Sequence, residues 1–351
     1  MAGPPDKHRD QQEHFVPPIQ CGRNVLEEYA QEFRGALVVT MDVPWKVVTK
    51  RLGTMEATPF MVESMEREAV ESAERSLPAF DTVIGLGGGT ALDMAKYVAW
   101  KRQARLVLVP SIMSVDASFT PSIAIREGKR VRYVGDVRPE VIVVDYELIR
   151  SAPAHLNRAG AGDIVSVHTA LFDWKLAHAE RNERYDPAIA DRARHALQKL
   201  TDGWRDIRDV TDDGIRLLAE LFAAVNELCF RFGNSRPEEG SEHFWAYNVE
   251  YVTGKQFIHG ELVCLGVVLM AELQDNLPGE VQRFLERAHV RYRPEDIHLS
   301  KDEIVRSLVS LRDYVGKEQL MFSIINTARI DTDATDKILS RFFGGRAKES
   351  P

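Results

Sequence analysis

The sequence has few of the features that mark disulfide-rich, membrane-spanning or nucleic-acid-binding proteins. Its three cysteines, Cys21, Cys229 and Cys264, are far apart and form no CxxC pair, which argues against a disulfide framework and a zinc knuckle. The net charge of -8 argues against non-specific binding to nucleic acid, and no apolar run approaches the length of a membrane span. The polar N-terminal stretch lacks the apolar core of a secretory signal. Together with free thiols, these absences lead us to expect a cytoplasmic protein.

The length and the pattern of the chain predict two domains. At 351 residues the chain is too long for one small core. We expect a disordered arm over residues 1–15 and an α/β, Rossmann-like domain with a mostly parallel sheet over residues 16–150. The long helical patterns that follow predict an all-α domain over residues 151–351. Because ligands often bind between domains, we expect the active site in the interdomain cleft.

The predicted elements follow from short β-branched runs and from longer helical periodicities. Strands are expected over residues 36–41, 59–62, 82–86, 105–109, 122–125, 131–134 and 141–145. Helices are expected over residues 24–34, 65–76, 92–102, 162–179, 187–200, 213–230, 241–251, 260–274, 280–288, 301–311 and 333–343.

A glycine cluster stands where the third of these strands meets a helix, in the stretch VIGLGGGTALDMAK. Gly87, Gly88 and Gly89 allow close approach of the backbone, and a helix beginning near Leu92 would direct free N–H groups at an anion. The loop is not a Walker A motif, and Thr90 stands where the last glycine of GxGxxG would be. The glycines alone fit a dinucleotide pyrophosphate and a tight βα turn equally well.

Asp42 directly follows the first predicted strand. An acid at the end of a parallel strand can bind the ribose hydroxyls of an adenosine and repels a 2′-phosphate. Taken alone, a strand-end acid facing water is the commoner case. If Asp42 does bind the ribose, it predicts a preference for NAD(H) over NADP(H).

The pattern GGGxxxDxAK resembles the superfamily of iron-type alcohol dehydrogenases, glycerol dehydrogenases and dehydroquinate synthases. The glycines, Asp93, Ala95 and Lys96 match it, and the resemblance implies that this loop holds a nicotinamide dinucleotide. The cofactor-binding residues that we expect on this basis are Asp42, Gly87, Gly88, Gly89, Thr90, Asp93, Ser111, Ser114 and Thr120.

Three segments in the helical half carry candidate metal ligands, namely Asp163 in AGAGD, His243 in SEH and His259 in HGE. One carboxylate and two imidazoles suit a catalytic metal, and each residue taken alone has an ordinary structural explanation. The three segments resemble the ligand segments of the glycerol-1-phosphate dehydrogenase family, as do the stretches DWKLAH and NSRP. The resemblance covers about Gly22 to Glu272. It implies one divalent metal, zinc first, with iron and nickel as alternatives.

The segment after the fourth predicted strand resembles the family's loop beside the nicotinamide and the substrate. Asp116 maps to a substrate-contacting acid, whereas Val115 and Ala117 replace a histidine and a glycine. Tyr247 replaces a second histidine one helical turn after His243, so it should face the site, but it cannot be the same proton shuttle at neutral pH. We expect Asp116 and Tyr247 to act in catalysis, and Asp116, Asp163 and Tyr247 to contact the substrate.

Cations for a substrate phosphate are harder to assign. The segment REGKRVR has the composition of a solvated hairpin rim, and Arg236 lies near the second ligand segment. We expect the first to face solvent and leave the role of Arg236 open. The cationic residues of that segment are Arg126, Lys129, Arg130 and Arg132.

The resemblance implies a metal-dependent, NAD(P)-linked oxidoreductase that interconverts sn-glycerol 1-phosphate and dihydroxyacetone phosphate, or a related keto-phosphate or polyol. Three alternatives stay open: a dehydroquinate-synthase-like cyclase, a dehydrogenase of an unphosphorylated polyol or alcohol, and a non-catalytic dinucleotide-binding protein. A cyclase needs several cations near the substrate, and the ligand helices offer only Lys255. A small-molecule substrate and no nucleic-acid partner are expected, and a homo-oligomer is left open.

Overall fold

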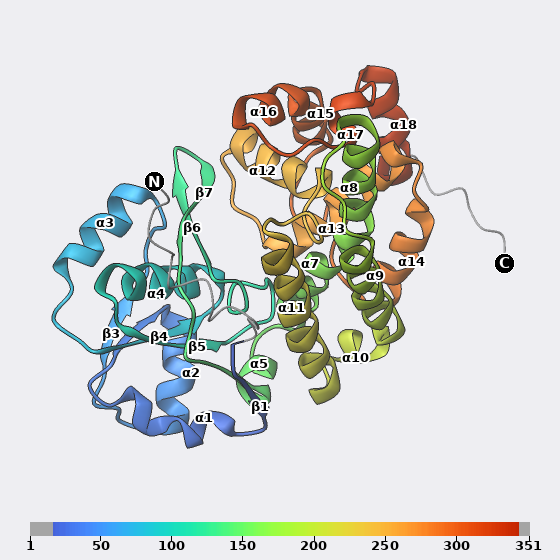
Figure 1. Cartoon of the computed structure of the whole chain (residues 1–351). Coiled ribbons are helices and arrows are strands. Elements are labelled where there is room, and N and C mark those ends of the chain that lie inside the picture. Colours follow the sequence, from blue (N-terminus) through green and yellow to red (C-terminus); the bar gives the residue numbers. More distant parts are fainter. Residues whose placement is uncertain (1–16, 344–351) are drawn as a thin grey trace, which may run out of the picture.

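The computed structural model describes residues 17–343, so the arm expected over residues 1–15 lies outside the described residues. The first half of the chain forms a parallel sheet, and the second half is helical (Figure 1). The six strands have the order β1-β8-β5-β4-β2-β3, with all pairs parallel. Their bounds are β1 Ile19–Gly22, β2 Leu37–Thr40, β3 Thr58–Met61, β4 Thr82–Gly87, β5 Arg105–Pro110 and β8 Val141–Asp145.

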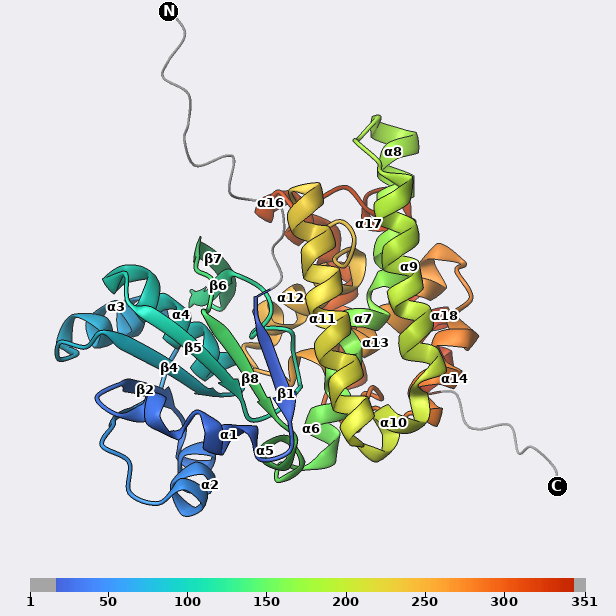
Figure 2. The same cartoon turned by 60° about the horizontal axis from the view of Figure 1, so that its bottom comes forward.

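Helices cover both faces of this sheet, which explains why its central strands are apolar throughout. Figure 2 shows α1 (Val25–Glu28) and α2 (Asp42–Leu52) on one face, and α3 (Arg67–Ser76) and α4 (Gly89–Arg102) on the other. Because side chains alternate along each strand, they contribute to two separate hydrophobic cores. A 3-10 turn, Ala30–Phe33, follows α1, and α5 (Tyr146–Arg150) follows β8.

A two-stranded hairpin, β6 (Ser122–Glu127) and β7 (Arg130–Asp136), stands apart from the main sheet and projects beside α12 (Ser241–Thr253) of the helical half (Figure 1). Its base is tied to α4 through Lys96, which is fully buried. The Lys96 ammonium lies 2.7 Å from the Asp93 carboxylate and donates to the Ser122 carbonyl at 2.5 Å. A buried charge needs such partners, so this contact fixes where the hairpin leaves the sheet.

The helical half is built around α13 (His259–Gln274), which is buried along nearly its whole length. The helices α7, α8, α12 and α14 pack against it, and α9 and α11 form an outer pair that packs together. The remaining bounds are α6 Ala154–Arg158, a 3-10 turn Ala159–Ala161, α7 Gly162–Val165, α8 Val167–Arg181, α9 Pro187–Asp202, α10 Trp204–Asp209, α11 Asp212–Phe232, α12 Ser241–Thr253, α14 Pro278–Arg287, α15 Lys301–Val309, α16 Leu311–Glu318, α17 Ile324–Thr327 and α18 Thr332–Phe343.

The predicted fold class is confirmed, and each predicted strand is present within two residues of its expected bounds. Several details differ, and the short helices α5, α6, α10, α16 and α17 were not among the expected ones. The expected helix over residues 24–34 is instead α1 and a 3-10 turn, preceded by the unexpected strand β1. Helix α2 was not expected, α4 begins at Gly89 rather than near Leu92, and the helix expected over residues 162–179 is divided at Ser166. Across residues 17–343, none of the helices combines the length and apolarity that a membrane crossing requires.

Candidate active site

A cleft of about 1580 Å³ separates the sheet from the helical half. It opens where β2, β4 and β5 end at their carboxyl edge, which is where open parallel sheets bind ligands. The loops after these strands form one wall, and the starts of α12 and α13 with the end of α11 form the other. The cleft therefore lies between the two halves, as expected from the sequence.

The glycine turn after β4 belongs to the sheet side of the cleft. Gly87 ends β4 with a φ of 153°, where a Cβ would lie 2.8 Å from that of Ala91. A Cβ on Gly88 would lie 2.8 Å from Ile112 Cδ1. Gly88 and Gly89 line the cleft, whereas Gly87 does not. No side chain caps the start of α4, so its first turn presents backbone amides and the positive end of the helix dipole to an anion.

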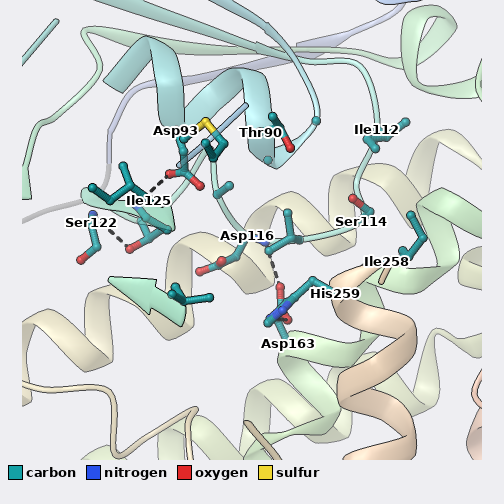
Figure 3. Close-up of a pocket in the computed structure, with 18 of the residues that line it drawn as sticks. Thr90, Asp93, Ile112, Ser114, Asp116, Ser122, Ile125, Asp163, Ile258 and His259 are labelled. Atoms are coloured by element: carbon teal, nitrogen blue, oxygen red, sulfur yellow. Dashed lines mark hydrogen bonds and ion pairs between the residues drawn. The ribbon is translucent and has the colours of Figure 1, made fainter. Parts of the chain in front are cut away.

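The other expected cofactor residues also line the cleft, and Figure 3 shows several of them. Asp93 has a second role, because its carboxylate pairs with Lys96 and accepts from the Ala124 amide of the hairpin. Burial raises the pKa of Asp93 in spite of the Lys96 charge. The lining residues of this set are Thr90, Asp93, Ser111, Ser114 and Thr120.

Asp42 is the first residue of α2 and lies at the mouth of the cleft. Its side chain is 70% exposed and lies 2.7 Å from the Lys46 ammonium, one turn further along the helix. An exposed pair of this kind adds little to stability. The carboxylate of Asp42 is therefore free to contact a ligand in the cleft.

The three expected metal ligands converge from three different helices. The donor atoms of Asp163 (α7), His243 (α12) and His259 (α13) lie within 4.8 Å of one another. Within residues 17–343, Asp163 Oδ1 is buried and has no hydrogen-bond partner, and it faces His259 Nε2 at 3.3 Å. A buried carboxylate oxygen left in this way fits a cation, so the donor set suits a divalent metal.

Glycines explain how the ligand segments come so close together. A Cβ on Gly162, next to Asp163, would lie 2.4 Å from the carbonyl oxygen of Gly260. A Cβ on Gly260, next to His259, would lie 1.8 Å from the carbonyl oxygen of Ala159. The glycines of AGAGD and HGE thus allow direct backbone contact between the two ligand segments.

Glu242 positions the second ligand, although the sequence analysis gave it no role. It is fully buried, and its Oε1 lies 2.8 Å from His243 Nδ1 and accepts from the Gly240 amide at 2.7 Å. Thr169 donates to its Oε2 at 2.6 Å. Burial lowers the pKa of His243, but the hydrogen bond and charge of Glu242, together with the charges of Glu239 and Asp163, outweigh burial and raise the pKa to about 9 in the absence of a metal. A carboxylate behind a ligating histidine leaves the other ring nitrogen to face a metal.

Asp116 joins the sheet side of the cleft to the metal ligands. Its backbone amide donates to Asp163 Oδ2 at 2.9 Å, a contact drawn in Figure 3 beside His259. Its carboxylate accepts from Asn226 Nδ2 of α11 at 2.7 Å. Burial, with a further contribution from Asp163, raises the pKa of Asp116 to about 6.

Tyr247 lies on the same face of α12 as His243, with the two ring centroids 6.2 Å apart. Its hydroxyl donates to Glu239 Oε1 at 2.9 Å and lies 3.3 Å from the hydroxyl of Tyr133 on the hairpin. His243, Tyr247, Glu239 and Tyr133 all line the cleft, and of these only Glu239 and Tyr133 had no role expected from the sequence. The tyrosine therefore faces the site, and its acidic partner precedes the helix.

The expectation of a solvated hairpin rim is wrong for the three arginines. Arg126 pairs with Glu250 of α12 at 2.9 Å, and Arg132 pairs with Glu318 at the end of α16 at 2.8 Å. Arg130 also pairs with Glu318, at 3.2 Å. Arg132 also pairs with Glu127 at 3.6 Å, but Glu250 and Glu318 lie more than 100 residues away, so no local pattern could reveal them. These ion pairs fasten the hairpin to the helical half across the cleft.

The question left open for Arg236 is answered by its burial. The guanidinium is fully buried, donates to both carboxylate oxygens of Glu183 at 2.8 and 2.6 Å, and donates to the Phe322 carbonyl at 2.8 Å. It does not line the cleft. Arg236 therefore holds helical segments together and is not available to a substrate.

Comparison with known proteins gives the family. Residues 28–153 match the family model described as iron-containing alcohol dehydrogenase. The glycerol-1-phosphate dehydrogenase [NAD(P)+] of Hyperthermus butylicus is 30% identical over 302 residues, covering 83% of this chain and 85% of that protein. The chain belongs to the glycerol-1-phosphate dehydrogenase family. The glycerol-1-phosphate dehydrogenase of Sulfolobus acidocaldarius is 32% identical over 247 residues, 69% of each chain.

Solved structures agree with this assignment at the level of the fold. The crystal structure of a probable glycerol dehydrogenase from Sinorhizobium meliloti superposes with a TM-score of 0.69 and 21% identity, covering 93% of this chain and 96% of that one.

Val115 and Ala117, the two residues that depart from the expected family pattern, lie against the glycine turn. A Cβ on Gly89 would lie 3.1 Å from Val115 Cγ1 and 3.8 Å from Ala117 Cβ. These two side chains thus pack beneath the cofactor side of the cleft.

Proposed function

We propose that the protein is a metal-dependent, NAD(P)-linked dehydrogenase that interconverts sn-glycerol 1-phosphate and dihydroxyacetone phosphate. The observation that carries the proposal is the convergence of Asp163, His243 and His259 within 4.8 Å, in the cleft that the glycine turn also lines. Curated relatives that share most of the chain are named glycerol-1-phosphate dehydrogenase [NAD(P)+].

The proposed cofactor site runs from the mouth of the cleft to the metal ligands. The pyrophosphate would rest on Gly88, Gly89 and the start of α4, and the adenosine ribose would face Asp42. Ser111, Ser114 and Thr120 would hold the nicotinamide half, which supplies or accepts the hydride. The exposed carboxylate of Asp42 favours NAD(H) over NADP(H), with Lys46 beside it as a counter-charge.

The proposed metal ligands are Asp163, His243 and His259, with Glu242 fixing the ring of His243. A divalent metal there supplies a positive charge that lowers the pKa of an alcohol or polarises a carbonyl. Zinc suits this donor set, and iron and nickel are the alternatives. The carboxylate of Asp116, held by Asn226, is placed to accept a hydrogen bond from a substrate hydroxyl.

A second candidate is a dehydrogenase of an unphosphorylated polyol, because carboxylates crowd the metal end of the cleft. The carboxylates of Asp116 and Glu239 both line it and would repel a phosphate placed beside them. For a phosphorylated substrate, the arginines that line the hairpin side, Arg126 and Arg138, are the candidate phosphate ligands.

The cyclase alternative has less support. Among residues 17–343, no lysine lines the cleft, and Lys255 pairs with Glu303 at 2.7 Å. A sugar-phosphate cyclase needs several cations around its substrate. The arginines Arg126 and Arg138 alone do not provide that density of charge.

A substrate panel on metal-reconstituted protein tests the proposal. We expect NADH oxidation with dihydroxyacetone phosphate that far exceeds that with dihydroxyacetone, and none in the His243→Ala variant. Turnover of the unphosphorylated ketone alone would favour the second candidate. Release of phosphate without net NADH oxidation would favour a cyclase. Absence of turnover with every metal and substrate would leave only the non-catalytic alternative.

A further inference from the structure

We propose that Tyr247 and Glu239 form the path by which the substrate's hydroxyl proton leaves for solvent, with Glu239 as the proton acceptor. This proposal rests on the proposed dehydrogenase function and names residues for a step that the metal ligands cannot perform. Alcohol oxidation releases a proton in addition to the hydride, and a group beside the substrate must accept that proton.

The geometry points from the metal site to the open cleft. Tyr247 lies one turn after His243 on α12, so both side chains face the same side of the helix. The Tyr247 hydroxyl donates to Glu239 Oε1 at 2.9 Å, which is a good hydrogen-bond distance. Glu239 is half-buried and lines the cleft, in the segment between α11 and α12. Its carboxylate therefore contacts Tyr247 and still reaches solvent.

The proton balance of the step is simple. In oxidation, the substrate O–H bond breaks and its proton passes to the Tyr247 oxygen, while the phenol's own proton passes to Glu239. The carbon–hydrogen bond breaks with both electrons, and the hydride passes to the oxidised nicotinamide. Burial, followed by the Glu239 charge, raises the pKa of Tyr247 well above its usual value. The tyrosine therefore stays neutral while it passes the proton from the substrate to Glu239. Reduction of the ketone runs the same path backwards, with the proton drawn from solvent.

The other titratable groups that face this pair have other partners. His243 bonds Glu242 through Nδ1. Glu238 is buried, and its carboxylate accepts from the Cys229 thiol, while burial raises the pKa of Glu238 well above its usual range. Tyr133 of the hairpin is 59% exposed and lies 3.3 Å from Tyr247, which makes it the one rival exit among these groups. Glu239 is preferred because a carboxylate can hold the proton and a neutral phenol cannot.

The test uses single-turnover rates in the metal-reconstituted protein with NAD and sn-glycerol 1-phosphate, with an indicator dye to follow proton release. We expect Glu239→Gln and Tyr247→Phe to slow turnover by about 100-fold or more, with the metal content of both variants and the KM of Glu239→Gln unchanged. The pH dependence of turnover should differ between wild-type protein and Glu239→Gln. Formate should restore turnover in Glu239→Ala, and Glu239→Asp should keep part of the rate. Glu180→Gln, an exposed change on α8, is the matched control.

The outcomes separate this proposal from the proposed function. If wild-type protein turns over and releases protons but Glu239→Gln matches it in rate, pH profile and proton release, the path is wrong and the function stands. If Tyr133→Phe causes the loss instead, the proton leaves through Tyr133 and the role of Glu239 is refuted. If wild-type protein turns over none of the panel's substrates, the proposed function itself fails and takes this inference with it.

Discussion

Replacement of Glu242 tests whether the metal site is organised as described. Its Oε1 contacts His243 Nδ1 and the Gly240 amide, and its Oε2 accepts from Thr169. Glutamine can keep a carbonyl oxygen towards His243, and its amide can face Thr169, whose hydroxyl also lies 3.1 Å from the Ser166 carbonyl. Glu242→Gln thus preserves the orientation of the His243 ring but removes the negative charge. Glu242→Ala removes the charge and also the contact that orients the ring.

The structure predicts a graded loss of metal affinity for these two variants. Loss of a carboxylate behind a ligating histidine weakens binding by about 10- to 100-fold. We expect about tenfold for Glu242→Gln, or about 1.4 kcal/mol, and about 100-fold for Glu242→Ala, or about 2.7 kcal/mol. Competition with a zinc-binding dye at fixed pH measures this, with Glu180→Gln as the control. Affinities within twofold of wild type for both variants, or an equal loss for both, would refute the reasoning.

Three further predictions follow from named contacts. Because the metal-free pKa of His243 is raised to about 9, metal must displace a proton, and apparent affinity should rise about tenfold per pH unit up to about pH 9 in calorimetric titrations. Asp42→Asn should shift the NADPH-to-NADH affinity ratio about tenfold towards NADPH, since a unit charge about 4 Å from a phosphate dianion costs about 1–2 kcal/mol in water. Arg236→Ala should lower the free energy of unfolding by about 3 kcal/mol in urea titrations yet leave the substrate KM unchanged.

Strong local signals made most of the fold predictable. The central strands are continuous apolar runs, and the long helices carry clear periodicity, so both could be placed from the sequence. The strand β1 was missed because IQCG is short and only half-buried at the sheet edge. Helix α2 was missed because DVPWKVVTKRL contains a proline and β-branched residues, although the proline stands in the first turn, where a helix tolerates it.

The candidate site was predictable where it depended on motifs and unpredictable where it depended on distant partners. The segments AGAGD, SEH and HGE indicated the three metal ligands, and the structure gives their glycines a packing role. Glu242 stood inside a quoted motif, and a carboxylate beside a ligand histidine was the signal that could have identified it. Asn226 and Glu239 gave no signal, because each acts on a side chain from another element. The arginines of the hairpin were misjudged for the same reason.

The most direct test of the central claim is the configuration of the product formed from dihydroxyacetone phosphate. Metal-reconstituted protein and NADH are incubated with the ketone, and the glycerol phosphate is analysed with enantiomer-specific enzymes. The account predicts one equivalent of sn-glycerol 1-phosphate for each NADH consumed, and none from the His243→Ala variant. Formation of the opposite enantiomer, or an absence of glycerol phosphate while NADH is oxidised with unphosphorylated ketones, would contradict it.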